Sequence, residues 1–196
     1  GSSADKLDFF TDIDLDSLVI FHAARTATEG HRQALFGYLL DTEDDTAAAA
    51  DSATLGARIG GACAHDVHYD LTAAWQTDYA AGENHDATML NTYLATDIEG
   101  VRVGAGYSGH SGQDGDDRPF GTLAGIGHKF NGWSDQFLGN NGSGAVSGLQ
   151  DAYVDVSCTI KGTKLLARYH TFNTAENVTG QFSGGYDREL NLQTKR

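Results

Sequence analysis

The chain has 196 residues, with 27 acidic and 13 basic side chains and a formal net charge of −14. No basic patch is available to displace counterions from phosphate groups, so the composition excludes nucleic acid as a partner and docking on anionic lipid headgroups through charge. We expect one domain over residues 1–196, in which Gly1-Ser2-Ser3 resembles the remnant of an expression tag. The 25 glycines and the single proline suit hairpins and closely packed strands.

Alternation of apolar and polar residues predicts nine strands. The clearest example is residues 67–79, where Leu71 and Trp75 fall on one face and Asp70 on the other. Successive side chains of a strand face opposite sides of a sheet, so this run has one apolar and one polar face. The segment 6–13 fits the same pattern as an additional strand. In chain order the nine predicted strands are 17–26, 32–42, 52–63, 67–79, 88–98, 101–109, 151–160, 163–173 and 186–195.

The predicted connections alternate between short and long. Glu99-Gly100 and Lys161-Gly162 are typical of two-residue hairpins, and the other connections are longer and often acidic. Short turns on one rim and long loops on the other are typical of outer-membrane barrels. We therefore predict an all-β fold: a single antiparallel up-and-down β-barrel of about 8–10 strands. Its one long loop or short-helix insertion lies at about 110–148, with helical spacing near 130–138.

Four segments of the C-terminal part form a set of motifs: 130–138 (FNGWSDQFL), 148–154 (GLQDAYV), 162–172 (GTKLLARYHTF) and 185–192 (GYDRELNL). With looser matches at 37–41 and 54–58, they resemble segments of bacterial outer-membrane porins related to the alginate-export proteins. The resemblance implies a barrel in the bacterial outer membrane that carries small or anionic solutes, such as carboxylates and sugar acids, by passive transport. Its expected partners are the lipid bilayer or detergent and small anionic solutes, and we expect a monomer. The resemblance also implies that members of that family are longer and have more strands.

If the apolar faces point outward, the polar faces line a lumen. Charged side chains that project into a narrow barrel either pair with one another and fill it, or select passing ions. The resemblance implies the second role, with arginines and lysines attracting an anionic polymer or a carboxylate while acidic partners hold them in place. The candidate solute-contacting residues, assigned by strand parity, are Arg58, His68, Asp70, Arg102, Lys164, Arg168 and His170.

The sequence offers only weak signals for catalysis or metal binding, and we predict no enzyme, no cofactor and no metal site. His65 and His68 fall on opposite faces of a strand, and the acidic segment 114–117 lacks the closing glutamate of an EF-hand. No nucleophile elbow is present, so we predict no catalytic residue. Cys63 and Cys158 are in step with the apolar faces of their segments, and a disulfide would require their strands to lie side by side.

A second hypothesis is a water-soluble barrel with its apolar residues inside. It would be a ligand binder, or an engineered soluble version of a membrane barrel without natural activity. The high charge supports it, as does the thin apolar content of 52–62 and 101–107, where a lipid-facing belt should be a continuous apolar band. The membrane hypothesis ranks first because of the resemblance.

Overall fold

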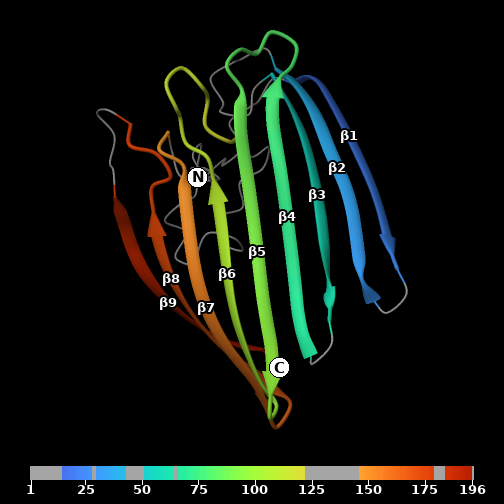
Figure 1. Ribbon diagram of the computed structural model, residues 1–196, viewed down its shortest axis with the longest axis vertical. Coiled ribbons are helices and arrows are strands. Elements are labelled where there is room, and N and C mark those ends of the chain that lie inside the picture. The colour runs from blue at the N-terminus through green and yellow to red at the C-terminus, as the bar shows by residue number, and fades with distance from the viewer. Residues whose placement is uncertain are drawn as a thin grey trace, which may run out of the picture.

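The computed structural model describes residues 15–27, 30–42, 51–63, 66–121, 146–178 and 184–195. In these residues the fold is all-β, with nine strands in one antiparallel sheet where each strand pairs with its neighbours in sequence (Figure 1). Among the described residues there is no helix of the length and hydrophobicity that crossing a bilayer requires. The strands are β1 (Leu15–Thr26), β2 (Arg32–Thr42), β3 (Ser52–Ala62), β4 (Val67–Asp78), β5 (Asp86–Ile98), β6 (Val101–His110), β7 (Leu149–Ile160), β8 (Thr163–Asn173) and β9 (Gly185–Lys195).

The nine strands predicted from alternation are confirmed, and no strand end differs from its prediction by more than two residues. The two short hairpins are confirmed as well. Glu99 and Gly100 have φ angles of 51° and 81°, and Lys161 and Gly162 have 49° and 79°. Positive φ at both central residues is the geometry of a type I′ turn, whose twist matches that of the flanking strands.

Connection length differs between the two ends of the sheet. The segments 27–31, 63–66, 99–100 and 161–162 join strands at one end, which we call the short-turn end. At the opposite, long-connection end, strands are joined by 43–51, 79–85, 111–148 and 174–184. The predicted asymmetry between the two rims is therefore confirmed.

The sheet is curved but not closed. Figure 1 shows β5 nearest the viewer and β1 and β9 receding on either side, so the sheet has a convex and a concave face. In the described residues β1 and β9 pair only with β2 and β8, so the predicted closed barrel is not observed. Nine antiparallel strands leave β1 and β9 running in the same direction, and a direct seam between them would be parallel and slightly weaker per residue. The predicted strand within 6–13 and the predicted helix near 130–138 lie outside the described residues.

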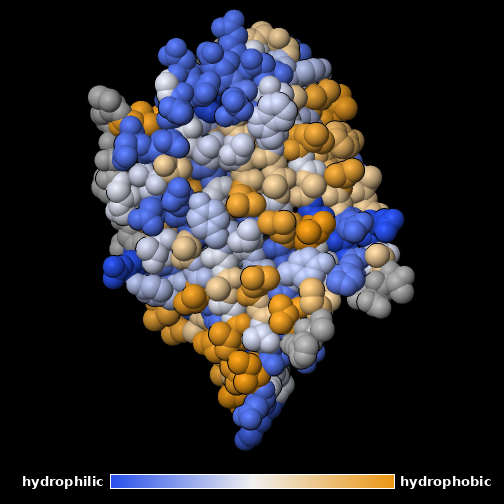
Figure 2. All heavy atoms as spheres, in the orientation of Figure 1, coloured by the Kyte–Doolittle hydropathy of each residue, from blue (hydrophilic) through white to orange (hydrophobic). Residues whose placement is uncertain are grey.

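The convex face is apolar and exposed. In Figure 2, which shows this face, hydrophobic residues spread across the strands, and hydrophilic residues gather at the upper end and at the lower tip. The strand register assigns to one face a set of large apolar side chains, all at least 36% exposed. Its members include Leu55, Ile59, Leu71, Trp75, Leu90, Leu94, Ile98, Val101, Val103, Val154, Val156, Ile160, Leu165, Tyr169, Leu190 and Leu192.

The concave face is buried at the long-connection end, where residues 111–121 cross it. We call this segment the strap. Phe120 of the strap is 2% exposed and packs with Ala74 and Ala87 of the sheet, beside Phe36 and Met89. The described residues contain only small apolar clusters of this kind, and most of their buried side chains are polar. Buried polar side chains must be held by hydrogen bonds.

Candidate functional site

The seven residues predicted to share a polar face do share one. Directly opposed residues of an antiparallel pair lie on the same face, so the register can be followed from strand to strand. Arg58 and Asp70 fall on the face that also carries Tyr93 of β5, and Tyr93 continues through Gly106 to Tyr153 and His170. This is the concave face. It carries Arg58, His68, Asp70, Arg102, Lys164, Arg168 and His170; their contact with a solute stays a prediction.

Arg102 is held by a carboxylate next to the β5–β6 turn. Its Nε donates to Asp97 Oδ1 at 3.0 Å and its Nη2 to Asp97 Oδ2 at 2.6 Å. The same Nη2 lies 2.9 Å from Nε2 of His68, which is also 3.1 Å from Asp97 Oδ2. His68 therefore accepts from Arg102 or donates to Asp97, depending on which nitrogen carries its proton. This group of three is one-third exposed and open to solvent on the concave side.

Arg168 lies in a second group, more buried than the first. Its Nη2 donates to Asp155 Oδ2 at 2.8 Å, and its guanidinium carbon lies 4.4 Å from the ring centre of Tyr153, within cation–π range. The hydroxyl of Tyr93 donates to the other oxygen of Asp155 at 3.0 Å. Tyr93 reaches that carboxylate across β6 because Gly104 lies beneath its ring, where a Cβ would lie 2.7 Å from the Tyr93 Cζ. The glycine therefore permits the link between β5 and β7.

His170 forms the most buried of these interactions. It is 1% exposed, and its Nδ1 lies 2.8 Å from Asp151 Oδ1. Its ring stacks on Phe172 with 5.3 Å between ring centres and 9° between planes, and Tyr153 lies at the same distance. A ring held on both sides and hydrogen-bonded to a carboxylate is fixed in orientation, so His170 is a structural part of the wall.

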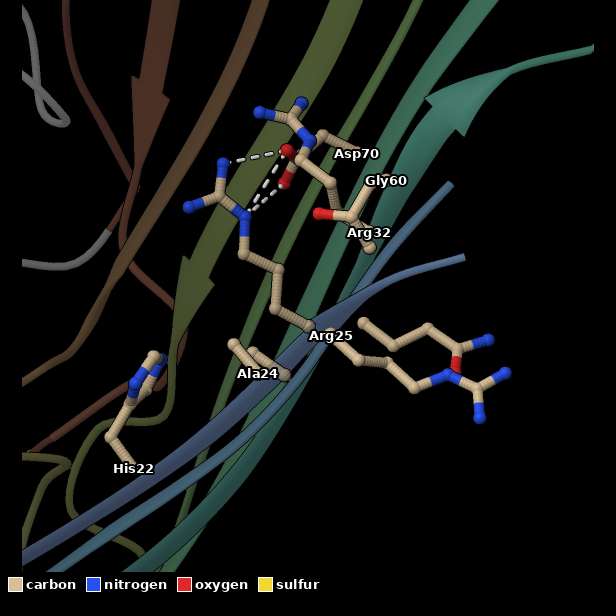
Figure 3. A pocket seen from close by; sticks show the side chains of 10 residues that line it. His22, Ala24, Arg25, Arg32, Gly60 and Asp70 are labelled. Carbon is tan, nitrogen blue, oxygen red and sulfur yellow. Dashed lines mark hydrogen bonds and ion pairs between the residues drawn. The ribbon is translucent and has the colours of Figure 1, made fainter. Parts of the chain in front are cut away.

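Arg58 and Lys164 are the most exposed of the predicted cations. Arg58 donates to Asp70 through Nε at 3.0 Å and Nη2 at 2.6 Å, with 56% of its side chain exposed. The dashed lines of Figure 3 mark this pair, which borders a cavity at the short-turn end. Lys164 is exposed at the start of β8, opposite Lys195 in the register. The structure thus places Lys164 on the predicted face but outside the ion-paired groups.

The strap is fixed to the concave wall by a paired hydrogen bond. Gln76 Nε2 donates to the carbonyl of Gly121 at 3.1 Å, and the Gly121 amide donates back to Gln76 Oε1 at 2.9 Å. Gln76 is fully buried and also donates to Thr54 Oγ1 at 3.0 Å. With Phe120 packed beside it, this contact closes the concave face at the long-connection end. The strap does not extend to the short-turn end.

Sequence reasoning missed the acidic partners Asp97, Asp155 and Asp151, although the two hairpins contained the signal for the first two. A two-residue turn at 99–100 places Asp97 opposite Arg102, and one at 161–162 places Asp155 opposite Arg168. Nothing in the sequence indicated the contact between Gln76 and Gly121.

Within the described ranges no group of three or more His, Cys, Asp or Glu side chains is arranged to hold a metal ion. Cys63, just beyond the end of β3, is exposed, and Cys158 of β7 is partly buried. Both are free thiols, and β3 and β7 do not pair with each other in the described sheet. Comparison of the chain with protein-family models, with curated proteins and with solved structures gave no match. The described part of the concave face carries the ion pairs of Arg58, Arg102 and Arg168 and hydroxyl groups such as that of Tyr93.

Proposed function

We propose that the nine-stranded sheet is the wall of an outer-membrane-type β-barrel that lets small polar or anionic solutes pass along its concave face. The proposal rests on the difference between the two faces of the sheet. Large exposed apolar side chains occupy the convex face, and paired charges occupy the concave face. Transmembrane barrels alternate apolar-out and polar-in in this way.

The convex face supports a lipid contact because of its extent. Exposed apolar residues extend from Leu35 on β2 to Leu192 on β9, which is 73% exposed. Soluble monomers rarely expose continuous apolar patches larger than a few hundred Å², and larger ones mark an interface with protein or lipid. Trp75 adds an amphipathic ring, since its Nε1 donates to Asp86 at 2.8 Å while half of the residue stays exposed. Such rings suit the boundary between lipid and water.

The proposal requires that the barrel closes, and closure must involve the two edge strands, β1 and β9. Ile20 of β1 and Leu190 and Leu192 of β9 are the most exposed large apolar residues of the described chain. A lipid bilayer offers no hydrogen bonds to the free backbone groups of an edge strand, so these edges must be paired. A direct seam would be parallel, and one further strand between β1 and β9 would make both new pairings antiparallel.

The test is reconstitution of the full chain. We expect it to require detergent, to migrate faster on a denaturing gel when unboiled than when boiled, and to give ion conductance in planar bilayers. A chain that stays monodisperse in buffer without detergent would instead support the water-soluble barrel. A chain that inserts but never conducts would overturn the transport role.

The lumen assignment has its own matched control. Arg102 lies on the concave face, whereas Arg25 falls on the convex side of β1 opposite Gln33. We expect Arg102→Ala to lower the anion-to-cation permeability ratio severalfold, because a fixed positive charge leaves the lumen. Arg25→Ala removes the same charge from the other face and should leave the ratio unchanged. Equal effects of the two substitutions would overturn the assignment of faces.

A further inference from the structure

A cavity of about 280 Å³ lies at the short-turn end of the concave face, between β1, β2, β3 and β4. Its charge is opposite to that of the chain. Two arginines of the concave face, Arg32 and Arg58, line it together with one carboxylate, Asp70, whereas the whole chain has a net charge of −14. Arg25 also borders the cavity, but the register places its side chain on the convex side of β1. A local excess of positive charge in an acidic protein is a feature that needs an explanation.

One guanidinium group, that of Arg58, is paired with the single carboxylate, and the side chain of Arg32 points toward it. Arg58 contacts Asp70 through Nε and Nη2, so its other terminal nitrogen, Nη1, is not used in that pair. Figure 3 shows the side chains of Arg32 and Asp70 pointing toward one another, while Arg25 points away from them. Within the described residues no hydrogen bond or ion pair occupies Arg32. One carboxylate balances one guanidinium, and the second positive charge remains available.

The backbone leaves room for a ligand at this point. Gly60 of β3 lies directly opposite Asp70 in the register, and a Cβ at Gly60 would lie 3.1 Å from Asp70 Oδ2. The glycine therefore keeps the space beside the carboxylate clear of side-chain atoms. The strap is attached to Gln76, near the opposite end of β4, so it leaves this cavity uncovered.

We propose that this cavity binds the oxyanion of a small solute, a carboxylate or a phosphate, with Arg32 and Arg58 as the binding residues. A guanidinium presents two parallel N–H groups that match the geometry of either oxyanion. Asp70 keeps Arg58 oriented, and Arg32 supplies the uncompensated charge. The volume lies at the lower limit of small-molecule sites, which favours a solute with few atoms beyond the charged group. The inference rests on the proposed function in that the bound solute is one that travels along the concave face.

The experiment is equilibrium binding to the full chain in detergent, measured by isothermal titration calorimetry with inorganic phosphate, glucuronate and neutral glucose as probes. We expect saturable binding of one phosphate or one glucuronate per chain and no binding of glucose. The tighter of the two anions identifies the chemical group that the site prefers. Absence of saturable binding by both anions would overturn the proposal.

Three variants locate the site. Arg32→Gln should weaken anion binding at least tenfold. Arg32→Lys should restore part of the affinity, because the positive charge returns without the two parallel N–H groups of a guanidinium. Lys161→Gln removes an exposed cation from the β7–β8 turn, outside the lining of this cavity, and should bind as the unmodified chain does. Equal affinities for Arg32→Gln and Lys161→Gln would overturn the assignment. Both positions are exposed, and circular dichroism checks that each variant keeps its strands.

The outcomes separate this proposal from the proposed function. Conductance in bilayers without anion binding would overturn the proposal that the cavity binds an anion, and the proposed transport role would remain. Anion binding that depends on Arg32, in a chain that never conducts, would overturn transport and support an anion-binding barrel instead.

Discussion

The guanidinium of Arg168 donates to the carboxylate of Asp155 at 2.8 Å in a place where that carboxylate is almost completely buried, with 1% of its side chain exposed. The pair of Arg58 and Asp70 has the same chemistry, but the two side chains are 56% and 25% exposed. Burial, not charge or distance, separates the two pairs. It should also separate the consequences of breaking them.

We expect Arg168→Ala to lower the free energy of unfolding by about 3–5 kcal/mol, since it leaves a buried carboxylate without its partner. Arg58→Ala should cost about 0–1 kcal/mol, because water replaces the lost contact. Urea-induced unfolding in detergent micelles, followed by tryptophan fluorescence, measures both values.

The control for that comparison is the double variant Asp155→Asn with Arg168→Gln. It removes both charges, so it should be more stable than Arg168→Ala alone. A double variant as unstable as the single one would show that Arg168 acts through its packing on Tyr153 and not through the ion pair.

The anchoring of the strap gives a second prediction. Phe120→Ala should remove about 3–5 kcal/mol of packing and release residues 111–121 from the wall. We expect faster amide exchange in the strap and a larger conductance, with the strands unchanged. Phe21→Ala, at a site that is 47% exposed, is the control and should leave exchange in the strap as it was. If amide exchange in the strap of Phe120→Ala is no faster than in the unmodified chain, Phe120 does not anchor the strap.

A third prediction concerns Gly104 and Gly106, the two glycines of β6 that lie under tyrosine rings. The ring of Tyr153 lies over Gly106, where a Cβ would approach its Cε2 to 2.7 Å. Gly106→Ala should displace the ring and its stacking with Tyr93, at a cost of about 1–3 kcal/mol. Ala105→Val, on the convex face of the same strand, should change stability by less than about 0.5 kcal/mol. Equal unfolding midpoints for the two variants would contradict the close approach.

The two thiols report on the environment of each surface. Cys158 falls on the convex face opposite Leu165, and Cys63 lies just beyond the end of β3. In a bilayer we expect a charged maleimide to modify Cys63 quickly and Cys158 at least tenfold more slowly, because lipid covers the latter. Mass spectrometry after brief labelling measures both. Rapid labelling of Cys158 in vesicles would count against a lipid-facing convex side.

The strands could be predicted because apolar and polar side chains alternate along each of them, as in 67–79. The two type I′ hairpins could be predicted from Glu99-Gly100 and Lys161-Gly162, and with them the register that pairs Asp155 with Arg168. The approach of Tyr93 to Asp155 runs across β6 over Gly104, and the attachment of Gly121 depends on how a long connection folds back. Alternation carries information on neither contact.

The odd number of strands has a consequence for sidedness. Leu15 starts β1 at the long-connection end, and Lys195 ends β9 at the short-turn end. If the nine strands cross a bilayer as we propose, the start of β1 and the end of β9 face opposite aqueous compartments. A protease site placed before Leu15 and one placed after Lys195 would be cut from different sides of a sealed vesicle. Each added strand would reverse that relation, so the two cleavage patterns report the parity of the complete wall.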